Sequence, residues 1–162
     1  MATPLVSARV ERTIAAPATD IWALIADVTR IGEFSPEARR AEWVGKADGP
    51  EVGARFKGYN ELGKAKWTTK STITESVYGR AFEFKVGGYF GPHWRYEFET
   101  TEAGTRVIET VEQNKPTPFP IRMIQRRNGV TDRTANLTEG MTTTLERIAG
   151  VAEAATHDVT SA

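Results

Sequence analysis

The sequence of 162 residues predicts an α+β fold: a curved, seven-stranded antiparallel sheet wraps around a long C-terminal helix, and two short helices lie between the first two strands. Three observations predict this class. Apolar and polar residues alternate over 5–15 and over most of 40–114, as in half-buried strands. Glycine-containing turns of hairpin length separate the alternating runs, which favours an antiparallel meander. From about residue 119 to 152 the apolar residues recur at helical spacing instead.

The N-terminal segment predicts one strand followed by short helices. Within residues 5–15 the apolar side chains fall on even positions, at Val6, Ala8, Val10 and Ile14. Pro17 ends this ladder, and proline is tolerated in the first turn of a helix. The stretch APATDIWALIADV (residues 16–28) therefore predicts a short helix with one apolar face. Gly32 and Pro36 break the pattern that follows, which favours a turn and a second short helix.

Six more strands follow in the predicted sheet. The alternating runs cover residues 39–46, 54–61, 64–77, 80–87, 92–101 and 105–113. The turn between the fourth and fifth of these runs has the sequence GGYFGP (87–92). Its Tyr89 and Phe90 are candidates for a lid over a cavity, or for a contact with a second subunit in a homodimer.

The C-terminal helix is predicted from Phe119 to Ala152, with Asn128-Gly129 as a kink. One face carries Met123, Val130, Leu137, Met141, Leu145 and Ile148. At 1.5 Å per residue such a helix extends about 50 Å, whereas seven strands span about 34 Å, so the helix crosses the whole sheet. We expect a single domain over residues 1–153 and a frayed tail over residues 154–162, where no periodicity is visible.

Composition excludes several functional classes. Lys plus Arg and Asp plus Glu each number 21, so no net charge attracts nucleic acid or an anionic membrane. The sequence has no cysteine and only two histidines, His93 and His157, which excludes thiol chemistry and histidine-rich metal sites. No run approaches the roughly 20 apolar residues of a membrane span. We expect a cytoplasmic protein without a metal or cofactor.

Three segments carry a resemblance to a known family. They are V-x-R-x-I-x-A-P at 10–17, DIWALIADV at 20–28 and N-x-x-E-G-M-x-x-T-L-E-R-I at 136–148. With the alternating strands between them, they resemble the SRPBCC or START-like (Bet v 1-like) superfamily, in its polyketide cyclase/dehydrase-type branch, over residues 5–153. The resemblance implies a helix-grip fold whose helices close a deep apolar cavity against the sheet. Members include lipid and hormone carriers, polyketide aromatase/cyclases, stress-related proteins and chaperone activators, so the fold alone does not select a function.

Strand and helix periodicity selects the side chains that face this cavity. The candidate ligand-binding residues from the sheet are Trp67, Phe82, Phe84, Trp94, Tyr96 and Phe98, and those from the helix are Val130, Thr134, Leu137 and Met141. Ordinary core packing explains any one of them equally well. Together, however, aromatic and hydroxyl-bearing side chains on one concave face are typical of a mostly apolar pocket with a few orienting polar groups.

Two charged residues, Arg12 and Glu109, share the parity of apolar neighbours and are predicted to point inward. A buried charge needs a partner, and the family topology places the first and last strands side by side, so we expect an Arg12–Glu109 pair. Such a pair either fixes the register near the end of the sheet or anchors a ligand carboxylate or carbonyl.

Three functions are compatible with the sequence. We favour a carrier or binding protein for a hydrophobic small molecule: a lipid, a fatty acyl chain or a polyketide-like metabolite. The alternative is a polyketide cyclase or dehydratase that uses Arg12, Glu109 and Tyr96, with Tyr59 as a further candidate, although no spacing marks a catalytic motif. The third is a protein-interaction module with a filled core. His93 lies at a strand start on the solvent-facing parity and is a weak candidate for a general base.

Overall fold

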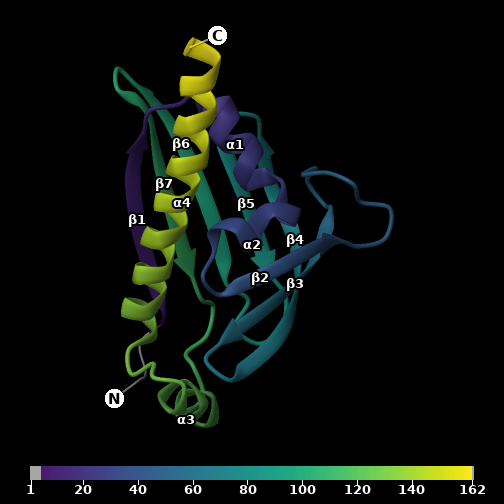
Figure 1. The fold of residues 1–162 in the computed structure, drawn as a ribbon. Coiled ribbons are helices and arrows are strands. Elements are labelled where there is room, and N and C mark those ends of the chain that lie inside the picture. The colour runs from purple at the N-terminus through teal and green to yellow at the C-terminus, as the bar shows by residue number, and fades with distance from the viewer. Residues whose placement is uncertain (1–4, 162) are drawn as a thin grey trace.

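The computed structural model describes residues 5–161 and contains one sheet and five helical segments in that range. In chain order the elements are β1 (Ser7–Ile14), α1 (Ala18–Ala26), the 3-10 turn η1 (Val28–Arg30), α2 (Ile31–Phe34), β2 (Ala38–Trp43), β3 (Arg55–Leu62), β4 (Ala65–Val77), β5 (Ala81–Val86), β6 (His93–Thr101), β7 (Gly104–Glu112), α3 (Phe119–Arg127) and α4 (Arg133–Ser161). The predicted seven strands and the short helices before β2 are confirmed (Figure 1).

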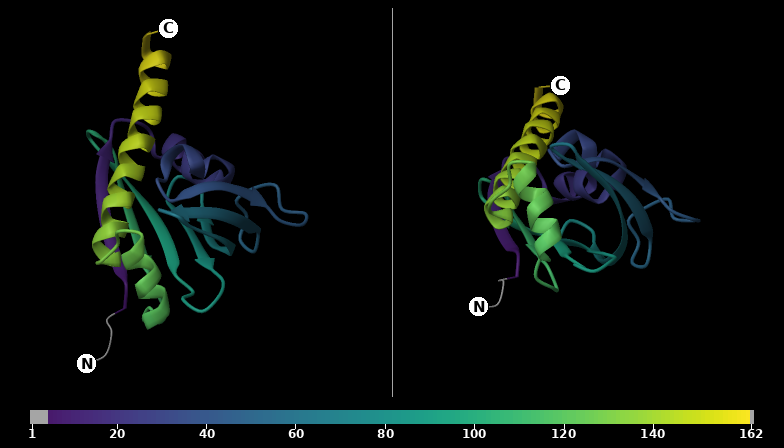
Figure 2. Two further views of the ribbon diagram at one scale, coloured as in Figure 1. Left: turned by 60° about the horizontal axis from the view of Figure 1, so that its bottom comes forward. Right: turned by 90° about the horizontal axis from the view of Figure 1, so that it is seen from below.

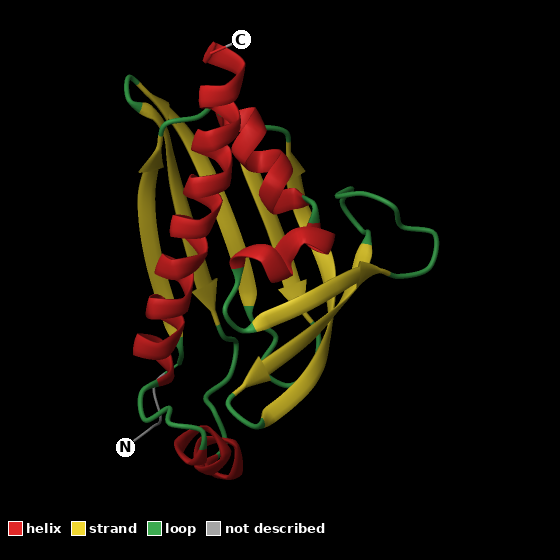
Figure 3. Ribbon diagram, in the orientation of Figure 1, coloured by secondary structure: helices red, strands yellow, loops and turns green. Residues whose placement is uncertain are grey.

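The sheet has the order β1-β7-β6-β5-β4-β3-β2, and every neighbouring pair is antiparallel. Hairpins connect the strands from β2 to β7 in sequence, and β7 then pairs with β1, from Ser7 opposite Glu112 to Ile14 opposite Thr105. The sheet curls strongly, and all the helices lie on its concave side (Figures 2 and 3). The helix-grip class predicted from the sequence is therefore confirmed.

The upper part of the molecule in Figure 1 contains a dense apolar core between α1, α4 and the sheet. Phe82 and Ile14 are fully buried there, and Trp22 of α1 packs edge-on against Phe82 at 6.3 Å between ring centroids. The indole Nε1 of Trp22 donates a hydrogen bond of 2.9 Å to the Ala81 carbonyl, so this large side chain is buried without an unsatisfied donor. Leu145 and Ile148 of α4 complete this cluster.

The predicted kink at Asn128-Gly129 is a complete break between α3 and α4, so the single helix expected from 119 to 152 is wrong. Asn128 folds back so that its Nδ2 donates to the Ile124 carbonyl, and Gly129 adopts a φ of +83°, which favours glycine. The Val130 amide then donates to the Gln125 carbonyl, which closes α3. Asp132 directly precedes α4 and caps it, because its carboxylate accepts a hydrogen bond of 3.1 Å from the Ala135 amide.

Helix α4 also extends further than predicted, through Ser161. Residues 154–161 of the predicted tail are helical, whereas residue 162 lies outside the described residues. No proline or glycine follows Gly150, and Ala152, Ala154 and Ala155 have high helix propensity. The helix propensity of these residues therefore continues the helix, although this segment has no apolar stripe.

A β-bulge in β4 changes which side chains face inward. The register with β5 shifts between Ile73 and Glu75, so residues beyond the bulge exchange faces. Ile73 is buried on the concave face, but Glu75 forms an ion pair with Arg95 on the convex face, and Val77 is 44% exposed. Strict alternation therefore does not hold along the whole of β4, because the odd-numbered side chains face inward as far as Ile73 and outward beyond it.

Candidate functional site

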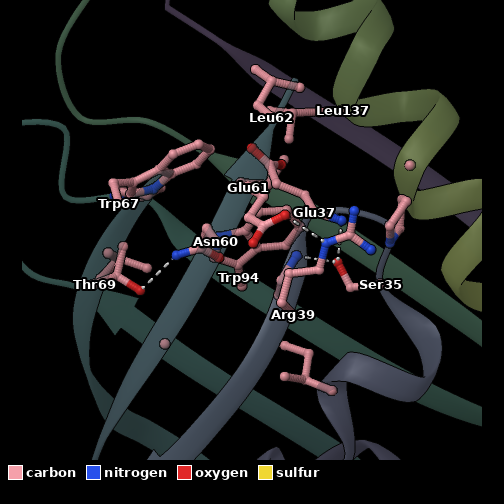
Figure 4. A pocket seen from close by; sticks show the side chains of 18 of the residues that line it. Ser35, Glu37, Arg39, Asn60, Glu61, Leu62, Trp67, Thr69, Trp94 and Leu137 are labelled. Carbon is pink, nitrogen blue, oxygen red and sulfur yellow. Dashed lines mark hydrogen bonds and ion pairs between the residues drawn. The ribbon is translucent and has the colours of Figure 1, made fainter. Parts of the chain in front are cut away.

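In the orientation of Figure 1, the lower half of the concave face encloses a cavity of about 890 Å³. Its walls come from β2 to β7, from the segment around α2 and from the first half of α4, and α3 borders its open side. Figure 4 shows side chains from several of these elements directed toward the same space. The strong curl of the sheet carries β2, β3 and β4 away from α4 and thereby leaves this volume between them (Figure 2).

The inner end of the cavity coincides with a row of three side chains across the sheet. Phe84 of β5, Tyr96 of β6 and Glu109 of β7 line the cavity. The next inward positions on the same strands, Phe82, Phe98 and Val107, belong to the packed core and do not line it. On α4 the same change occurs along the helix, because Leu137, Met141 and Thr144 border the cavity whereas Leu145 and Ile148 lie in the core.

Aromatic rings form much of the apolar wall. Phe84 stacks on Trp94 with 6.5 Å between centroids, and it also contacts Phe56 edge-on at 5.1 Å. Trp94 is only half-buried, so part of its indole faces the cavity rather than protein. Trp67 of β4 lies nearer the rim and is 37% exposed (Figure 4). These rings offer a large apolar surface to whatever occupies the space.

Tyr96 and Glu109 form a buried polar pair at the inner end. The phenol Oη of Tyr96 donates to Oε1 of Glu109 at 2.8 Å, and Glu109 is 1% exposed. Burial raises the pKa of the Glu109 carboxyl to about 8, although the Tyr96 hydrogen bond lowers it in part. Burial also holds the pKa of the Tyr96 phenol well above its usual value, and the neighbouring carboxyl adds to this. At neutral pH both groups are therefore mainly protonated.

The rim toward α2 is polar and held by ion pairs. Arg133, at the start of α4, contacts Glu37 at 2.6 Å and donates to the Asn136 side chain at 2.6 Å. Both members of the Arg133–Glu37 pair are less than a quarter exposed. On the neighbouring strands Arg39 pairs with Glu61 at 3.5 Å (Figure 4). Arg133 and Arg39 therefore already have carboxylate partners within the protein.

The remaining rim consists of the turn between β5 and β6 and of α3. Tyr89 and Phe90 border the cavity and contact one another edge-on at 5.4 Å. Tyr89 is 55% exposed, and Lys115 lies 4.8 Å from its ring. From α3, Ile121 and Ile124 border the opening. The turn thus has the position expected of a lid, and its role as a lid or as a subunit contact stays a prediction.

Eleven of the twelve sequence-predicted ligand residues, all except Arg12, separate into three groups. Seven of them line the cavity: Trp67, Phe84, Trp94, Tyr96, Glu109, Leu137 and Met141. Phe82 and Phe98 face the same side of the sheet but are packed in the core. Val130 and Thr134 instead border a separate, smaller cavity of about 370 Å³ beside the N-terminal strand and α3. Their displacement follows from the break between α3 and α4, which the sequence analysis treated as a kink.

The predicted Arg12–Glu109 pair does not form. Arg12 lies opposite Val107 in the sheet register, and Val10 is the residue opposite Glu109. Arg12 is exposed at the edge strand β1, and its side chain has no ion pair or hydrogen bond within residues 5–161. Parity indicates on which face of a strand a side chain lies, but it does not indicate whether α4 covers every position on that face. At Arg12 the long side chain extends to solvent.

Tyr59 does not belong to the cavity either, because its ring lies on the convex face of β3. There its hydroxyl donates to Glu42 at 2.8 Å, and the Arg40 guanidinium lies 4.1 Å from its ring. The side chains that no sequence pattern indicated include the rim residues Glu37, Asn60 and Arg133. No local pattern marks them, because each comes from a different element and they meet only in the fold.

The charged residues of the described chain do not form a metal centre. No group of three or more Asp, Glu or His side chains within residues 5–161 is arranged to hold a metal ion. None of the helices in this range combines the length and apolar character needed to cross a bilayer.

Comparison with known families gives a match over most of the chain. Residues 6–153 match the family described as "Polyketide cyclase / dehydrase and lipid transport". This span includes every element from β1 to most of α4 and therefore the whole cavity wall. No curated protein sequence is significantly similar to the chain.

Solved structures with the same fold include three informative examples. A protein of Chromobacterium violaceum (CV1439) is 14% identical, with a TM-score of 0.68, over 93% of this chain and 99% of that one. The di-domain ARO/CYC StfQ from the steffimycin biosynthetic pathway is 15% identical with a TM-score of 0.74; the match covers 94% of this chain but only 52% of StfQ. The Polyketide_cyc-like protein Cgl2372 from Corynebacterium glutamicum is 27% identical with a TM-score of 0.55, over 96% and 94%.

Proposed function

Because the chain belongs to the polyketide cyclase / dehydrase and lipid transport family, we propose that it binds a hydrophobic small molecule in the cavity and acts as a carrier or binding protein. The observation that carries this proposal is the cavity itself, with about 890 Å³ between α4 and the curled sheet. This volume lies at the upper end of the 300–1,000 Å³ typical of small-molecule sites. A lipid, a fatty acyl chain or a polyketide-like molecule is of suitable size.

The chemistry of the walls supports an apolar ligand. Phe56, Phe84, Trp94 and Met141 present rings and aliphatic groups, and each apolar Å² that a ligand covers contributes roughly 25 cal/mol. The rim cations Arg39 and Arg133 are engaged by Glu61 and Glu37, so they do not offer a free charge to an anionic group. The expected ligand is therefore held mainly by its hydrocarbon surface.

A neutral fluorescent probe tests the proposal. N-phenyl-1-naphthylamine fluoresces strongly only in apolar surroundings, so we expect saturable binding to the protein. Gly140→Leu adds a side chain at a cavity-lining position, where an added Cβ would lie 3.4 Å from Pro36. Gly150→Leu is its matched control, since Gly150 lies on the same helix with open space around an added Cβ.

The proposal predicts that Gly140→Leu reduces probe affinity while Gly150→Leu leaves it unchanged. Both replacements remove a helical glycine, so their effects on helix propensity are alike. Equal affinity in both variants, or no saturable binding to the parent protein, contradicts the cavity as the binding site. The latter result favours a protein-interaction module.

The second candidate function is a cyclase or dehydratase acting in the same cavity. The observation that favours it is the Tyr96–Glu109 pair, since a carboxyl whose pKa is raised to about 8 is suited to proton transfer near neutral pH. StfQ, which shares the fold, is itself described as an ARO/CYC protein. If the protein is an enzyme, the parent protein converts its ligand, and Glu109→Gln binds the ligand equally well but no longer converts it. If the protein is a carrier, neither the parent protein nor Glu109→Gln converts the ligand.

The proposal extends to the partner and the location. We propose that the small molecule is the principal partner, with neither nucleic acid nor membrane insertion required, and that the protein acts in the cytoplasm. We also propose a homodimer whose subunits contact one another through the turn that contains the exposed Tyr89. Sedimentation of the parent protein and of Tyr89→Ser distinguishes this dimer from a monomer.

A further inference from the structure

The inner end of the cavity contains an unpartnered polar atom. Oε1 of Glu109 accepts the hydrogen bond from Tyr96, but Oε2 is buried and has no hydrogen-bond partner within residues 5–161. A buried carboxyl oxygen without a partner is costly, and such exceptions call for an explanation such as a ligand or a water molecule. Glu109 itself borders the cavity, so a ligand at the inner end would lie beside this carboxyl.

The surroundings of Glu109 determine what it can recognise. Val10 faces it from β1, Val107 and Val111 flank it on β7, and Met141 of α4 borders the same space. Tyr96 is the titratable group that shifts the pKa of Glu109, and no charged side chain contributes to that shift. Arg12 on β1 is exposed, and Arg39 and Arg133 lie at the rim in ion pairs. No cation within the described chain stabilises an anion at this position.

We propose that Glu109 is a neutral hydrogen-bond donor that selects ligands carrying an uncharged carbonyl oxygen, such as a ketone, at the end that enters the cavity first. The geometry assigns the proton: Oε1 already accepts from Tyr96, so the proton lies on Oε2, and Oε2–H has no acceptor among the described residues and is left for one on a ligand. This proposal rests on the proposed function, because it requires a ligand in the cavity.

The donor role also excludes other ligand ends. A hydrocarbon end leaves Oε2–H unpaired, and a carboxylate end brings a negative charge into an apolar site without a cation. The site thus orients a molecule with its carbonyl inward and its chain toward the rim. Because burial raises the pKa of Glu109 to about 8, the donor is present at neutral pH and is lost as the pH rises through that value.

Two neutral probes test this assignment. Prodan is a naphthalene with a ketone whose emission shifts to longer wavelength when its carbonyl accepts a hydrogen bond, whereas N-phenyl-1-naphthylamine has no carbonyl. The double variant Glu109→Leu/Tyr96→Phe removes both polar partners and leaves neither unsatisfied. Glu109→Gln is the conservative variant, since its amide keeps an N–H donor without a titratable group.

We expect the double variant to lose about tenfold in prodan affinity relative to N-phenyl-1-naphthylamine, with a blue-shifted bound emission. Glu109→Gln retains the preference. Raising the pH from about 6 to about 9.5 weakens prodan binding to the parent protein but not to Glu109→Gln. An unchanged ratio of the two affinities in the double variant overturns the assignment, as does equal pH dependence in the parent and Glu109→Gln.

The two proposals fail in different ways. If N-phenyl-1-naphthylamine does not bind to the parent protein, the cavity is not a ligand site and the proposed function fails. If it binds normally while prodan shows no dependence on Glu109, the cavity binds ligands by hydrocarbon surface alone and only the donor role is overturned. Circular dichroism of each variant confirms that a loss of binding does not reflect unfolding.

Discussion

The two ends of the concave face use the same helix and the same strands in different ways. Toward the C-terminal half of α4, Phe82, Leu145 and Ile148 are at most 1% exposed and pack densely with α1. Toward its N-terminal half, Leu137 and Met141 border about 890 Å³ of open volume. The boundary is one row of side chains, Phe84, Tyr96 and Glu109, because the next residues inward on those strands belong to the core.

The position of α1 divides the fold into a packed end and a hollow end. Helix α1 fills the space between α4 and the sheet with Ile21 and Trp22, whereas the hollow end has no such filler. There the short helix α2 and the curled strand β2 remain at the rim. Dense packing at one end stabilises α4 in place, and the other end can remain open without loss of the fold.

The largest expected effect distinguishes two phenylalanines that are neighbours on β5. Phe82→Ala at the packed end creates a cavity in a dense core and should lower the free energy of unfolding by about 3–5 kcal/mol. Phe84→Ala enlarges an existing cavity, so we expect a smaller loss of stability and a larger change in the affinity of N-phenyl-1-naphthylamine. Urea denaturation and probe titration measure both quantities; identical profiles contradict the division into two ends.

The next effect is the pH dependence of stability. The Glu109 pKa in the folded state is about 8, above the ordinary value of 4.5, so the folded protein binds a proton that the unfolded chain releases between these values. Stability should therefore fall as the pH rises from about 4.5 to about 8, by up to about 1.4 kcal/mol per pH unit. In Glu109→Gln this contribution is absent. Denaturation curves of both proteins at several pH values give the difference, and parallel pH profiles rule out a protonated Glu109.

A smaller effect is expected at the polar rim of the hollow end. Glu37→Gln weakens the partly buried contact with Arg133 and should cost about 1 kcal/mol of stability. It should also accelerate probe dissociation, because the contact connects the start of α4 to the segment before β2. Stopped-flow dissociation of N-phenyl-1-naphthylamine measures the latter. Glu33→Gln, which affects the exposed Arg30–Glu33 pair, is the control, and an equal acceleration there removes the specific role of Glu37.

The smallest effect is expected at Arg12, which belongs to neither end. Since this side chain is exposed and its guanidinium has no partner within residues 5–161, Arg12→Met should change stability by less than about 0.5 kcal/mol. Ligand preference between carbonyl-bearing and hydrocarbon probes should also be unchanged. A marked loss of binding to acidic or carbonyl-bearing ligands in this variant would restore the anchor role that the sequence suggested.

The sequence predicted the fold more completely than the site because strand alternation and turn signals are local. The period of two identified the seven strands, and the period of β6 correctly placed Trp94 and Tyr96 inward. Parity failed where a non-local feature intervened. The bulge in β4 turned Val77 outward, and the break at Gly129 moved Val130 to a second cavity.

The site depends on distances between residues that are far apart in the sequence, and no local sequence pattern encodes these distances. Glu109 was identified from its parity, but its partner proved to be Tyr96 on the neighbouring strand rather than Arg12. The register decides this, because one residue of shift changes every opposing pair. The cavity volume depends on how far the sheet curls and on which positions α1 fills, and both are properties of the assembled fold.

Native mass spectrometry of the gently purified protein tests the hollow end most directly. We expect a bound mass of roughly a few hundred daltons in the parent protein and in Gly150→Leu, lost on denaturation and depleted in Gly140→Leu. A protein that carries only its own mass in all three forms, and that acquires no apolar compound when incubated with one, would contradict the claim that this space holds a ligand.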